Sequence, residues 1–246
     1  MLYAILVIYN KSVLDSTTYL FCKEHKDIQL IVCDNSTIDN DNKMIVEKDG
    51  YHYISMHGNK GLSRAYNVAI DEIQNKQGYI MILDDDTRLN EEYYLSIQNL
   101  NCDIAIPIVK SQTSILSPCN MDHYVASGWD GKSEIKHISA INSGMVVNLK
   151  LFENYRYDEN LFLDYVDHHF MMDMQNKDIQ VLDCVIYQEF SAEEKTSLES
   201  CLNRFRIFKK DSKYFYRNHK LQYFFVVYKR AGRLIFQYKS LRFLFE

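Results

Sequence analysis

Short apolar runs alternate with amphipathic segments over the first hundred residues of the chain. Four runs are apolar almost throughout, which is typical of strands covered on both faces: residues 3–9, 28–33, 51–56 and 79–83. Residues 12–25, opened by Ser12, and residues 62–75, which place apolar side chains on one face, indicate helices. This alternation predicts an α/β fold with a mostly parallel, Rossmann-like sheet flanked by helices.

A polar cluster follows each of these four strands. The clusters are Asn10-Lys11, Asp34-Asn35-Ser36, Asn59-Lys60-Gly61 and Asp84-Asp85-Asp86. In parallel sheets, ligands bind beyond the carboxyl ends of the strands. We therefore expect all four clusters to border one crevice, and their convergence is more informative than any one of them alone.

The rest of the chain has a weaker pattern. Residues 103–109 and 140–148 indicate two more strands, whereas residues 110–137 indicate an irregular excursion with polar turns. Residues 161–177 indicate a helix that carries Asp164, Asp167 and His168, and a long helical segment begins after residue 196. The N-terminal apolar run is too short for a secretory signal, and no later stretch holds ~18 uninterrupted apolar residues, so we expect no transmembrane helix.

The charge of the chain is unevenly distributed between its body and its C-terminal segment. The chain has 246 residues, 47% of them hydrophobic, which allows a sizeable core, and its net charge is −5. From residue 203 to residue 246, however, 12 Lys and Arg side chains stand against two acids. An acidic body with a basic C-terminal segment favours an anionic surface as partner. The six cysteines form no CxxC pair, which indicates reduced thiols in a cytosolic protein.

Asp84, Asp85 and Asp86 form the strongest candidate for chemistry. Three adjacent carboxylates repel one another, and a divalent cation would relieve that repulsion. Mg²⁺ and Mn²⁺ prefer oxygen ligands and often bridge to substrate phosphates. The alternative is an acidic turn that caps the helix following it.

Two further clusters also have two interpretations each. Gly61 permits a sharp turn into a helix, and Lys60 and Arg64 at the N-terminus of that helix suit a diphosphate. An ordinary loop with surface cations is the alternative. Asp34 suits either the N3–H of a uracil or thymine ring or an Asx turn.

The order of these motifs resembles a known family. The motifs are Tyr9-Asn10, Val32-Cys33-Asp34-Asn35-Ser36, Asn59-Lys60-Gly61 with Ala65 and Asn67, and Leu83-Asp84-Asp85-Asp86-Thr87. Together they resemble the nucleotide-binding half of family 2 glycosyltransferases. Ser143-Gly144 resembles the strand before the acceptor site, and residues 157–167 resemble the segment with the catalytic base. The resemblance spans roughly residues 1–190, implies the GT-A fold, and is greatest for the rhamnosyltransferase-type branch, which builds bacterial cell-surface polysaccharides.

The resemblance implies roles for individual residues. Asp34 would contact the nucleotide base, and Asp84 and Asp86 would form the DxD pair, with Asp86 as metal ligand and Asp84 nearer the ribose or the metal. Asp167 aligns with the general base. The residue before it is Val166, where the family has Glu, and Asp164, one helical turn earlier, could supply that carboxylate. The remaining donor-binding residues that the resemblance implies are Asn10, Asn59, Lys60, Gly61, Arg64 and Asp85.

The sequence departs from the family at one metal-binding position. Many relatives place a histidine after the strand near residues 187–191, where this chain has Tyr187-Gln188-Glu189-Phe190-Ser191. Gln188 or Glu189 could substitute for the histidine, or the metal could have fewer protein ligands. His168 and His169 adjoin the base, but an exposed helical histidine is more often a surface residue.

The resemblance implies an inverting transfer of a sugar, with rhamnose as a candidate, from a dTDP- or UDP-linked donor. It implies Mn²⁺ or Mg²⁺ as cofactor and a saccharide or lipid-linked acceptor in bacterial capsule or cell-wall polysaccharide synthesis. One alternative is a non-catalytic sugar-nucleotide- or polysaccharide-binding module, which the absent histidine leaves open. Another is a nucleotidyltransferase, which the lack of glycine in Tyr9-Asn10-Lys11-Ser12 disfavours.

We expect a GT-A domain over residues 1–202, with a nucleotide-binding half (1–100) and an acceptor-binding half (101–202), and a helical extension over residues 203–246. The extension interleaves basic and aromatic residues. It suits an anionic membrane interface, packing on the body or, least of all, single-stranded nucleic acid. The same surface could pair two chains as a homodimer. The expected location is the cytoplasm, peripherally at the inner face of the cell membrane.

Overall fold

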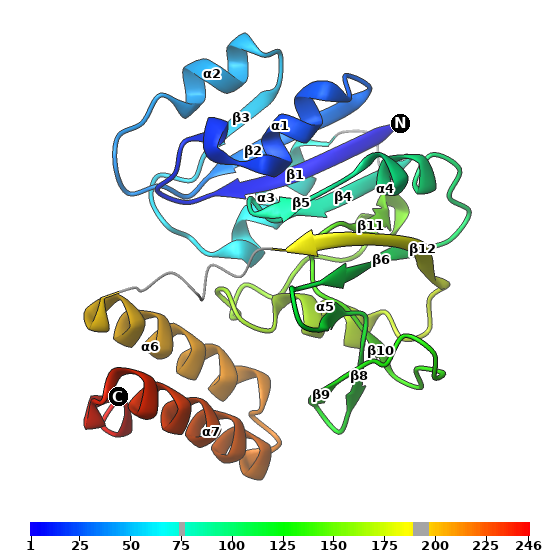
Figure 1. The fold of residues 1–246 in the computed structure, drawn as a ribbon. Helices are drawn as coiled ribbons and strands as arrows, with labels where there is room; N and C mark the ends of the chain where they lie inside the picture. The colour runs from blue at the N-terminus through cyan, green and yellow to red at the C-terminus, as the bar shows by residue number, and fades with distance from the viewer. Residues whose placement is uncertain (74–76, 189–196) are drawn as a thin grey trace.

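The computed structural model describes residues 1–73, 77–188 and 197–246. The N-terminal half of its central sheet consists, in spatial order, of β3 (His52–Ser55), β2 (Ile28–Asp34), β1 (Leu2–Ile8) and β4 (Tyr79–Leu83). These strands are all parallel, so their carboxyl ends meet at one edge of the sheet (Figure 1). The predicted GT-A type of sheet, mostly parallel and flanked by helices, is thus confirmed.

The second half of the chain extends the sheet beyond β4. The strands that follow are β11 (Met145–Asn148), β6 (Ile104–Lys110), β12 (Ile179–Gln188) and β5 (Thr87–Arg88), with β7 (Ile115–Ser117) beside β6. β11 is antiparallel to both of its neighbours, and β12 is parallel to β6. In the antiparallel pairing of β5 with β12, Gln188 lies opposite Thr87. The end of β12 therefore reaches the three aspartates that precede Thr87.

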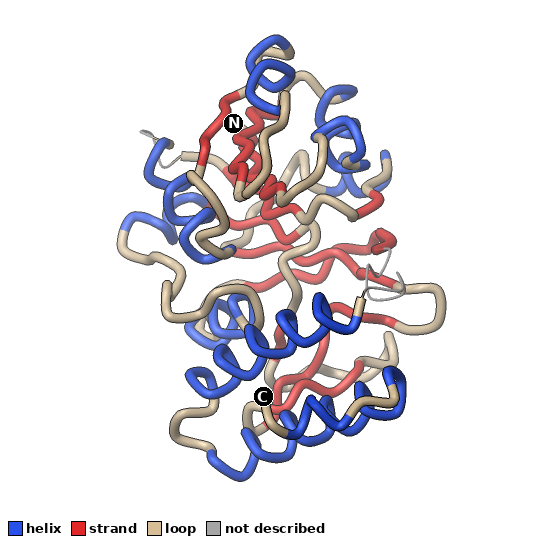
Figure 2. Tube along the Cα trace, turned by 90° about the vertical axis from the view of Figure 1, so that its left-hand side faces the viewer, coloured by secondary structure: helices blue, strands red, loops and turns tan. Residues whose placement is uncertain are grey.

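Side chains of the central strands alternate between two cores, which explains their continuous apolar runs. In β1, Ile5 packs in one core and Ala4 and Leu6 pack in the other. The helices α3 (Leu62–Glu72) and α5 (Val166–Asp173) cover the first core, and the helices α1 (Thr17–Glu24), α2 (Asn42–Lys48) and α4 (Glu91–Ser96) cover the second. The sheet consequently runs through the middle of the molecule, with helices on either side (Figure 2).

Several elements differ from those predicted. The helix expected over residues 12–25 is divided into a 3₁₀ turn, η1 (Val13–Asp15), and α1, because Ser16 ends the turn and caps the helix through its side chain. Residues 110–137 are not simply irregular, since they contain β7, β8 (Cys119–Asp122) and β9 (Val125–Gly128). β8 pairs with β9 and with β10 (Ile138–Ser139) in a small second sheet. Strands this short and polar have too little alternation to be detected from sequence.

The helix expected over residues 161–177 is shorter, and Asp164 lies outside it. The helix α5 begins at Val166, after Tyr165, whose φ of 67° is left-handed. The carboxylate of Asp211 accepts the backbone N–H groups of Phe162, Leu163 and Asp164 at 3.1, 2.8 and 2.9 Å. A side chain from a distant helix therefore satisfies these three donors, and the segment before α5 need not be helical.

The C-terminal segment folds into a helical hairpin of α6 (Leu198–Phe215) and α7 (Lys220–Tyr238), followed by a 3₁₀ turn, η4 (Leu241–Leu244). α6 lies between the body and α7 (Figure 1). The hairpin has its own small core, built on Leu202, Phe205, Phe208, Val227, Ala231 and Phe243. Phe215 and Tyr216, at the end of α6, pack instead in the core of the body. The boundary expected between residues 202 and 203 lies within α6.

Candidate active site

The polar clusters that follow β1 to β4 are joined to one another. The side-chain oxygen of Asn10 accepts the backbone N–H of Thr37 at 2.8 Å, and Lys11 forms an ion pair with Asp85 at 3.0 Å. The amide of Asn35 bridges to the third cluster, where its oxygen accepts the N–H of Lys60 and its nitrogen donates to the carbonyl of Gly61. These bonds bring the four predicted clusters next to one another at the carboxyl ends of the strands.

Asp34 lies at the wall of a cavity of about 440 Å³. Its carboxylate accepts the backbone N–H of Ser36 at 2.8 Å, the amide of Asn42 at 3.0 Å and the hydroxyl of Tyr53 at 3.1 Å. Burial alone would raise the pKa of Asp34, but the hydrogen bonds from Ser36 and Asn42 outweigh it, so the pKa is lowered. The cavity is lined by Asp34, Ser36, Thr37, Ile38, Asp39, Asn40, Tyr53, Ser55, His57 and Gly58.

Asp84 and Asp86 face the end of β12. Asp84 accepts the hydroxyl of Ser143, and the amide nitrogen of Gln188 donates to both Asp84 (3.2 Å) and Asp86 (3.3 Å). Burial, together with the charges of Asp86 and Asp167, raises the pKa of Asp84 to about 7, against the hydrogen bond from Ser143. Burial and the neighbouring Asp85 also raise the pKa of Asp86. Carboxylates that repel each other in a partly buried site are the environment that a cation stabilises.

The chemistry of these side chains fits a divalent cation held mainly by its substrate. Over residues 1–73, 77–188 and 197–246, no three His, Cys, Asp or Glu side chains are grouped as metal ligands. Mg²⁺ in phosphate-transferring sites usually needs only one or two carboxylates, since substrate phosphates and water complete its shell. Glu189, the other candidate to replace the family's histidine, lies outside the described residues.

The helix α3 and the segment before α5 are bonded directly to each other. The N–H of Leu62 donates to the carbonyl of Phe162 at 2.7 Å, and Asn67 exchanges two hydrogen bonds with the backbone of Tyr157. Gly61 has a φ of 88°, and a Cβ added there would lie 2.6 Å from the Phe162 carbonyl. Glycine is therefore required both by the backbone conformation and by the close approach of this segment.

The two cations predicted on the donor loop have different surroundings. The guanidinium of Arg64 is hydrogen-bonded to Glu159 at 3.0 Å, on the segment before α5. The side chain of Lys60 is exposed at the edge of the crevice. Arg64 thus helps to hold the segment before α5 against α3. The side chain of Lys60, by contrast, is directed to solvent. Asn59 supports the turn, because its side chain accepts the N–H of Gly61 at 3.1 Å.

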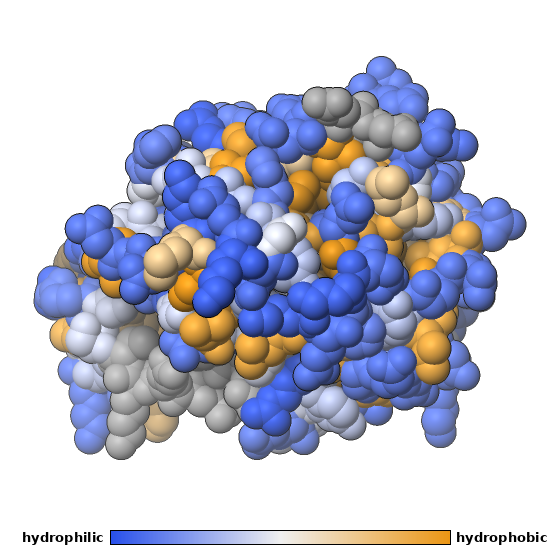
Figure 3. Space-filling view, turned by 90° about the horizontal axis from the view of Figure 1, so that it is seen from above, coloured by the Kyte–Doolittle hydropathy of each residue, from blue (hydrophilic) through white to orange (hydrophobic). Residues whose placement is uncertain are grey.

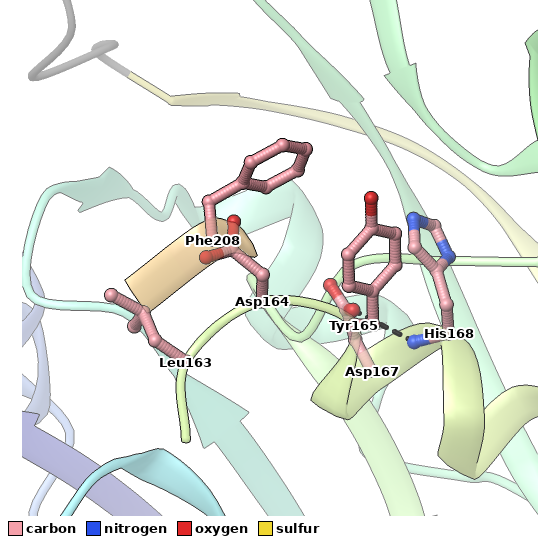
Figure 4. Close-up of a pocket in the computed structure, with 6 residues that line it drawn as sticks. All are labelled: Leu163, Asp164, Tyr165, Asp167, His168 and Phe208. Atoms are coloured by element: carbon pink, nitrogen blue, oxygen red, sulfur yellow. Dashed lines mark hydrogen bonds between the residues drawn. The ribbon is translucent and has the colours of Figure 1, made fainter. Parts of the chain in front are cut away.

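Asp167 lies in the first turn of α5 and lines a second cavity, of about 290 Å³ (Figure 4). The other lining residues are Leu163, Asp164, Tyr165, His168 and Phe208. One oxygen of Asp167 accepts the backbone N–H of His168 at 2.7 Å, which fixes the carboxylate at the start of the helix. His168 is oriented in turn by Ser139, at 2.7 Å from its Nδ1. Phe208 comes from α6, so the hairpin forms one wall of this cavity.

Asp164 is engaged by two arginines of the hairpin. Arg204 forms two hydrogen bonds with its carboxylate, one of them 2.8 Å, and Arg230 lies at 3.6 Å. Arg230 also covers the ring of Phe208, with its guanidinium carbon 4.1 Å from the ring centroid. Since Asp164 precedes α5, it does not share a helix face with Asp167, and the spacing argument for that pair was wrong. The structure instead places Asp164 at the junction of the body and the hairpin.

Several residues of the site had no signal in the sequence. Tyr53 and Asn42 contact Asp34 although neither belongs to a polar cluster that follows a strand. Asp211 lies 44 residues beyond Asp167 and resembles any polar position on an amphipathic helix. Its complete burial, which only the fold reveals, distinguishes it from the exposed polar residues of α6.

Comparisons with known proteins show related sequences and a related fold. Residues 3–109 match the model of glycosyl transferase family 2. A protein of Shigella flexneri, dTDP-rhamnosyl transferase RfbF, is 24% identical over 192 residues, which cover 73% of this chain and 65% of the relative. The match thus spans just under two thirds of that relative's length. Among solved structures, S. aureus TarS 1-349 is similar with a TM-score of 0.55 and 16% identity, covering 87% of this chain and 80% of that one.

The matched family segment ends within β6, so it contains all four polar clusters that border the crevice. The structural similarity covers 87% of the chain and therefore extends into its second half as well. Residues 3–109 match the model of glycosyl transferase family 2, and the chain that contains them has the GT-A fold and is similar to a protein named as a dTDP-rhamnosyl transferase.

Proposed function

We propose that the protein transfers a sugar from a nucleoside-diphosphate donor to an acceptor hydroxyl with inversion at the anomeric carbon. The observation that carries this proposal is a hydrogen bond between the element proposed to bind the sugar donor and the segment proposed to lead to the base. It runs from the N–H of Leu62, at the start of α3, to the carbonyl of Phe162. It holds the N-terminus of α3 against the segment that leads to Asp167. A family match to glycosyltransferases favours this reaction over a nucleotidyltransferase or a non-catalytic binding module.

In this mechanism the cavity at Asp34 takes the nucleotide base, with Tyr53 on its wall. Lys60, exposed beside the start of α3, faces the diphosphate, and its charge and the positive end of the helix dipole favour negative charge there. Asp167 accepts the proton of an acceptor hydroxyl in the second cavity, and the oxygen attacks the anomeric carbon from the side opposite the diphosphate. Asp164 holds the base segment to the hairpin instead of acting on the substrate.

A divalent cation, Mn²⁺ or Mg²⁺, would be held by Asp86 and Asp84 and would neutralise charge on the departing nucleoside diphosphate. We expect chelator to abolish sugar transfer and either cation to restore it, since the two carboxylates otherwise repel the diphosphate. The measurement is release of nucleoside diphosphate before and after dialysis against chelator. Full activity in excess chelator would contradict the assignment of Asp84 and Asp86.

The donor is proposed to be dTDP- or UDP-linked, with rhamnose as first candidate because a matched relative is named a dTDP-rhamnosyl transferase. The acceptor is proposed to be a saccharide or a lipid-linked saccharide of bacterial surface polysaccharide synthesis. A panel of nucleotide sugars, read by release of the nucleoside diphosphate, tests the donor. Hydrolysis of one donor without any acceptor would still support the nucleotide site, whereas binding of no sugar nucleotide at all would contradict the whole proposal.

We also propose that the hairpin holds the protein at an anionic membrane surface. Within the described ranges, no helix is long and apolar enough to cross a membrane. α7 nevertheless exposes large apolar side chains on one side, here called the α7 face: Leu221, Phe224, Phe225, Tyr228 and Phe236. Exposed Lys220, Lys229 and Arg233 flank it. By contrast, the top of the N-terminal half is mostly hydrophilic, with hydrophobic side chains in separate patches (Figure 3).

We expect the protein to co-sediment with anionic liposomes at low salt and much less at high salt. Each base near an anionic bilayer contributes about 1 kcal/mol, so Lys229→Glu with Arg233→Glu should weaken binding by at least roughly tenfold. Lys48→Glu with Lys132→Glu, two exposed lysines of the body, is the charge-matched control and should change it little. If the α7 pair binds like wild type, the α7 face is not a membrane contact, and the sedimentation coefficient then shows whether it pairs two chains.

A further inference from the structure

Gln188 is the last residue of β12, and its amide contacts the aspartate pair. Its side chain lies 3.2 Å from an oxygen of Asp84 and 3.3 Å from an oxygen of Asp86, so one group touches both carboxylates. The pairing of Gln188 with Thr87 fixes its backbone immediately beyond the aspartates. The side chain of Gln188 is half-buried.

An amide can serve this position in two ways. In the structure its NH₂ group donates to both carboxylates, which reduces their repulsion. Rotation of the terminal amide by half a turn would present its carbonyl oxygen at the same place, because the oxygen and nitrogen of a glutamine amide are almost equal in size. A carbonyl oxygen is a hard ligand of the kind that Mg²⁺ prefers, whereas an imidazole favours later transition metals.

We propose that Gln188 is a protein ligand of the divalent cation in the donor complex, and that it makes the protein's contribution to that site entirely oxygen. This inference rests on the proposed transfer from a nucleoside-diphosphate donor. Ser143 supports the arrangement, since its hydroxyl donates to Asp84 on the same oxygen that Gln188 contacts. Such a site would select Mg²⁺ and Mn²⁺ over softer cations such as Co²⁺.

The experiment measures cation binding directly, without turnover. Mn²⁺ is titrated into the protein with UDP or dTDP present, and bound Mn²⁺ is followed by electron paramagnetic resonance, with Mg²⁺ and Co²⁺ as competitors. We expect Gln188→Ala to weaken Mn²⁺ binding by about 10-fold or more, the usual effect of disturbing a metal's surroundings. Gln188→His should restore Mn²⁺ binding and improve competition by Co²⁺ relative to Mg²⁺ by about 10-fold. Gln180→Ala, an exposed amide on the same strand, is the matched control.

The outcomes separate this inference from the function on which it rests. If wild type binds Mn²⁺ with the nucleotide but Gln188→Ala binds it equally well, the ligand role of Gln188 is wrong and the donor site stands. If Gln188→His restores Mn²⁺ binding but Co²⁺ and Mg²⁺ compete as they do in wild type, the proposal that an oxygen ligand at this position selects the cation is wrong. If wild type binds neither nucleotide with any cation, the proposed donor site itself fails, and the inference fails with it.

Discussion

Asp167→Asn should lower turnover by ~10²–10⁴-fold, the usual contribution of general-base catalysis, while the affinity for nucleoside diphosphate stays near that of wild type. An amide cannot accept the proton of the acceptor hydroxyl. Its oxygen can still accept the N–H of His168, so the start of α5 should keep its structure. Turnover is measured with saturating donor and acceptor, and affinity by calorimetric titration of UDP or dTDP.

The matched comparison for this variant is Asp164→Asn. Both aspartates line the same cavity, but Asp164 is bound by Arg204 and Arg230, whereas Asp167 accepts the backbone N–H of His168 in α5. We therefore expect Asp164→Asn to reduce thermal stability and to keep most of its turnover at low temperature. Near-normal turnover of Asp167→Asn, with a large loss of turnover in Asp164→Asn, would mean that Asp164 is the base and Asp167 is not.

The nucleotide-binding half could be predicted because each of its signals is local. A buried parallel strand is apolar throughout, and the polar residues at its end mark where the ligand binds. Asp34, Asn59 and Asp84 were found in this way, and the structure brings their clusters together. The α2 helix was not predicted, because its seven residues bury little more than Val46 and therefore show no apolar face in the sequence.

The acceptor half was harder because its site is assembled by contacts between distant segments. Asp164 and Asp167 are three residues apart, a spacing that suggests one helix face, yet a left-handed Tyr165 lies between them. The sequence also left open whether the C-terminal segment contacts a membrane or the body. In the structure α6 packs on the body and α7 exposes its rings, so the two helices of one segment have different surroundings.

Asp211 explains why the hairpin cannot be treated as an appendage. Its carboxylate is fully buried and accepts three consecutive backbone N–H groups of the segment that leads to the base. Although burial raises the pKa of Asp211, the three N–H groups act against that shift. In the same segment, the carbonyls of Leu161 and Phe162 accept hydrogen bonds from two residues of α3, Ser63 and Leu62. One side chain of α6 thus fixes the segment that contacts α3 and leads to Asp167.

Asp211→Ala should therefore lower the free energy of unfolding by about 3 kcal/mol or more, because each buried donor left without a partner costs roughly 1–3 kcal/mol. For a chain of this size that corresponds to a fall in Tm of roughly 6–12 °C. Thermal unfolding followed by circular dichroism measures the change in Tm, and Lys210→Ala, an exposed neighbour on α6, is the control.

Asp211→Asn keeps one acceptor oxygen and should lose less stability than Asp211→Ala. At temperatures where Asp211→Asn is folded, its kcat should fall more than its affinity for nucleoside diphosphate, since the base segment moves while the cavity at Asp34 does not. Equal stability of Asp211→Ala and wild type would mean that water replaces the carboxylate and that the hairpin does not hold the base segment.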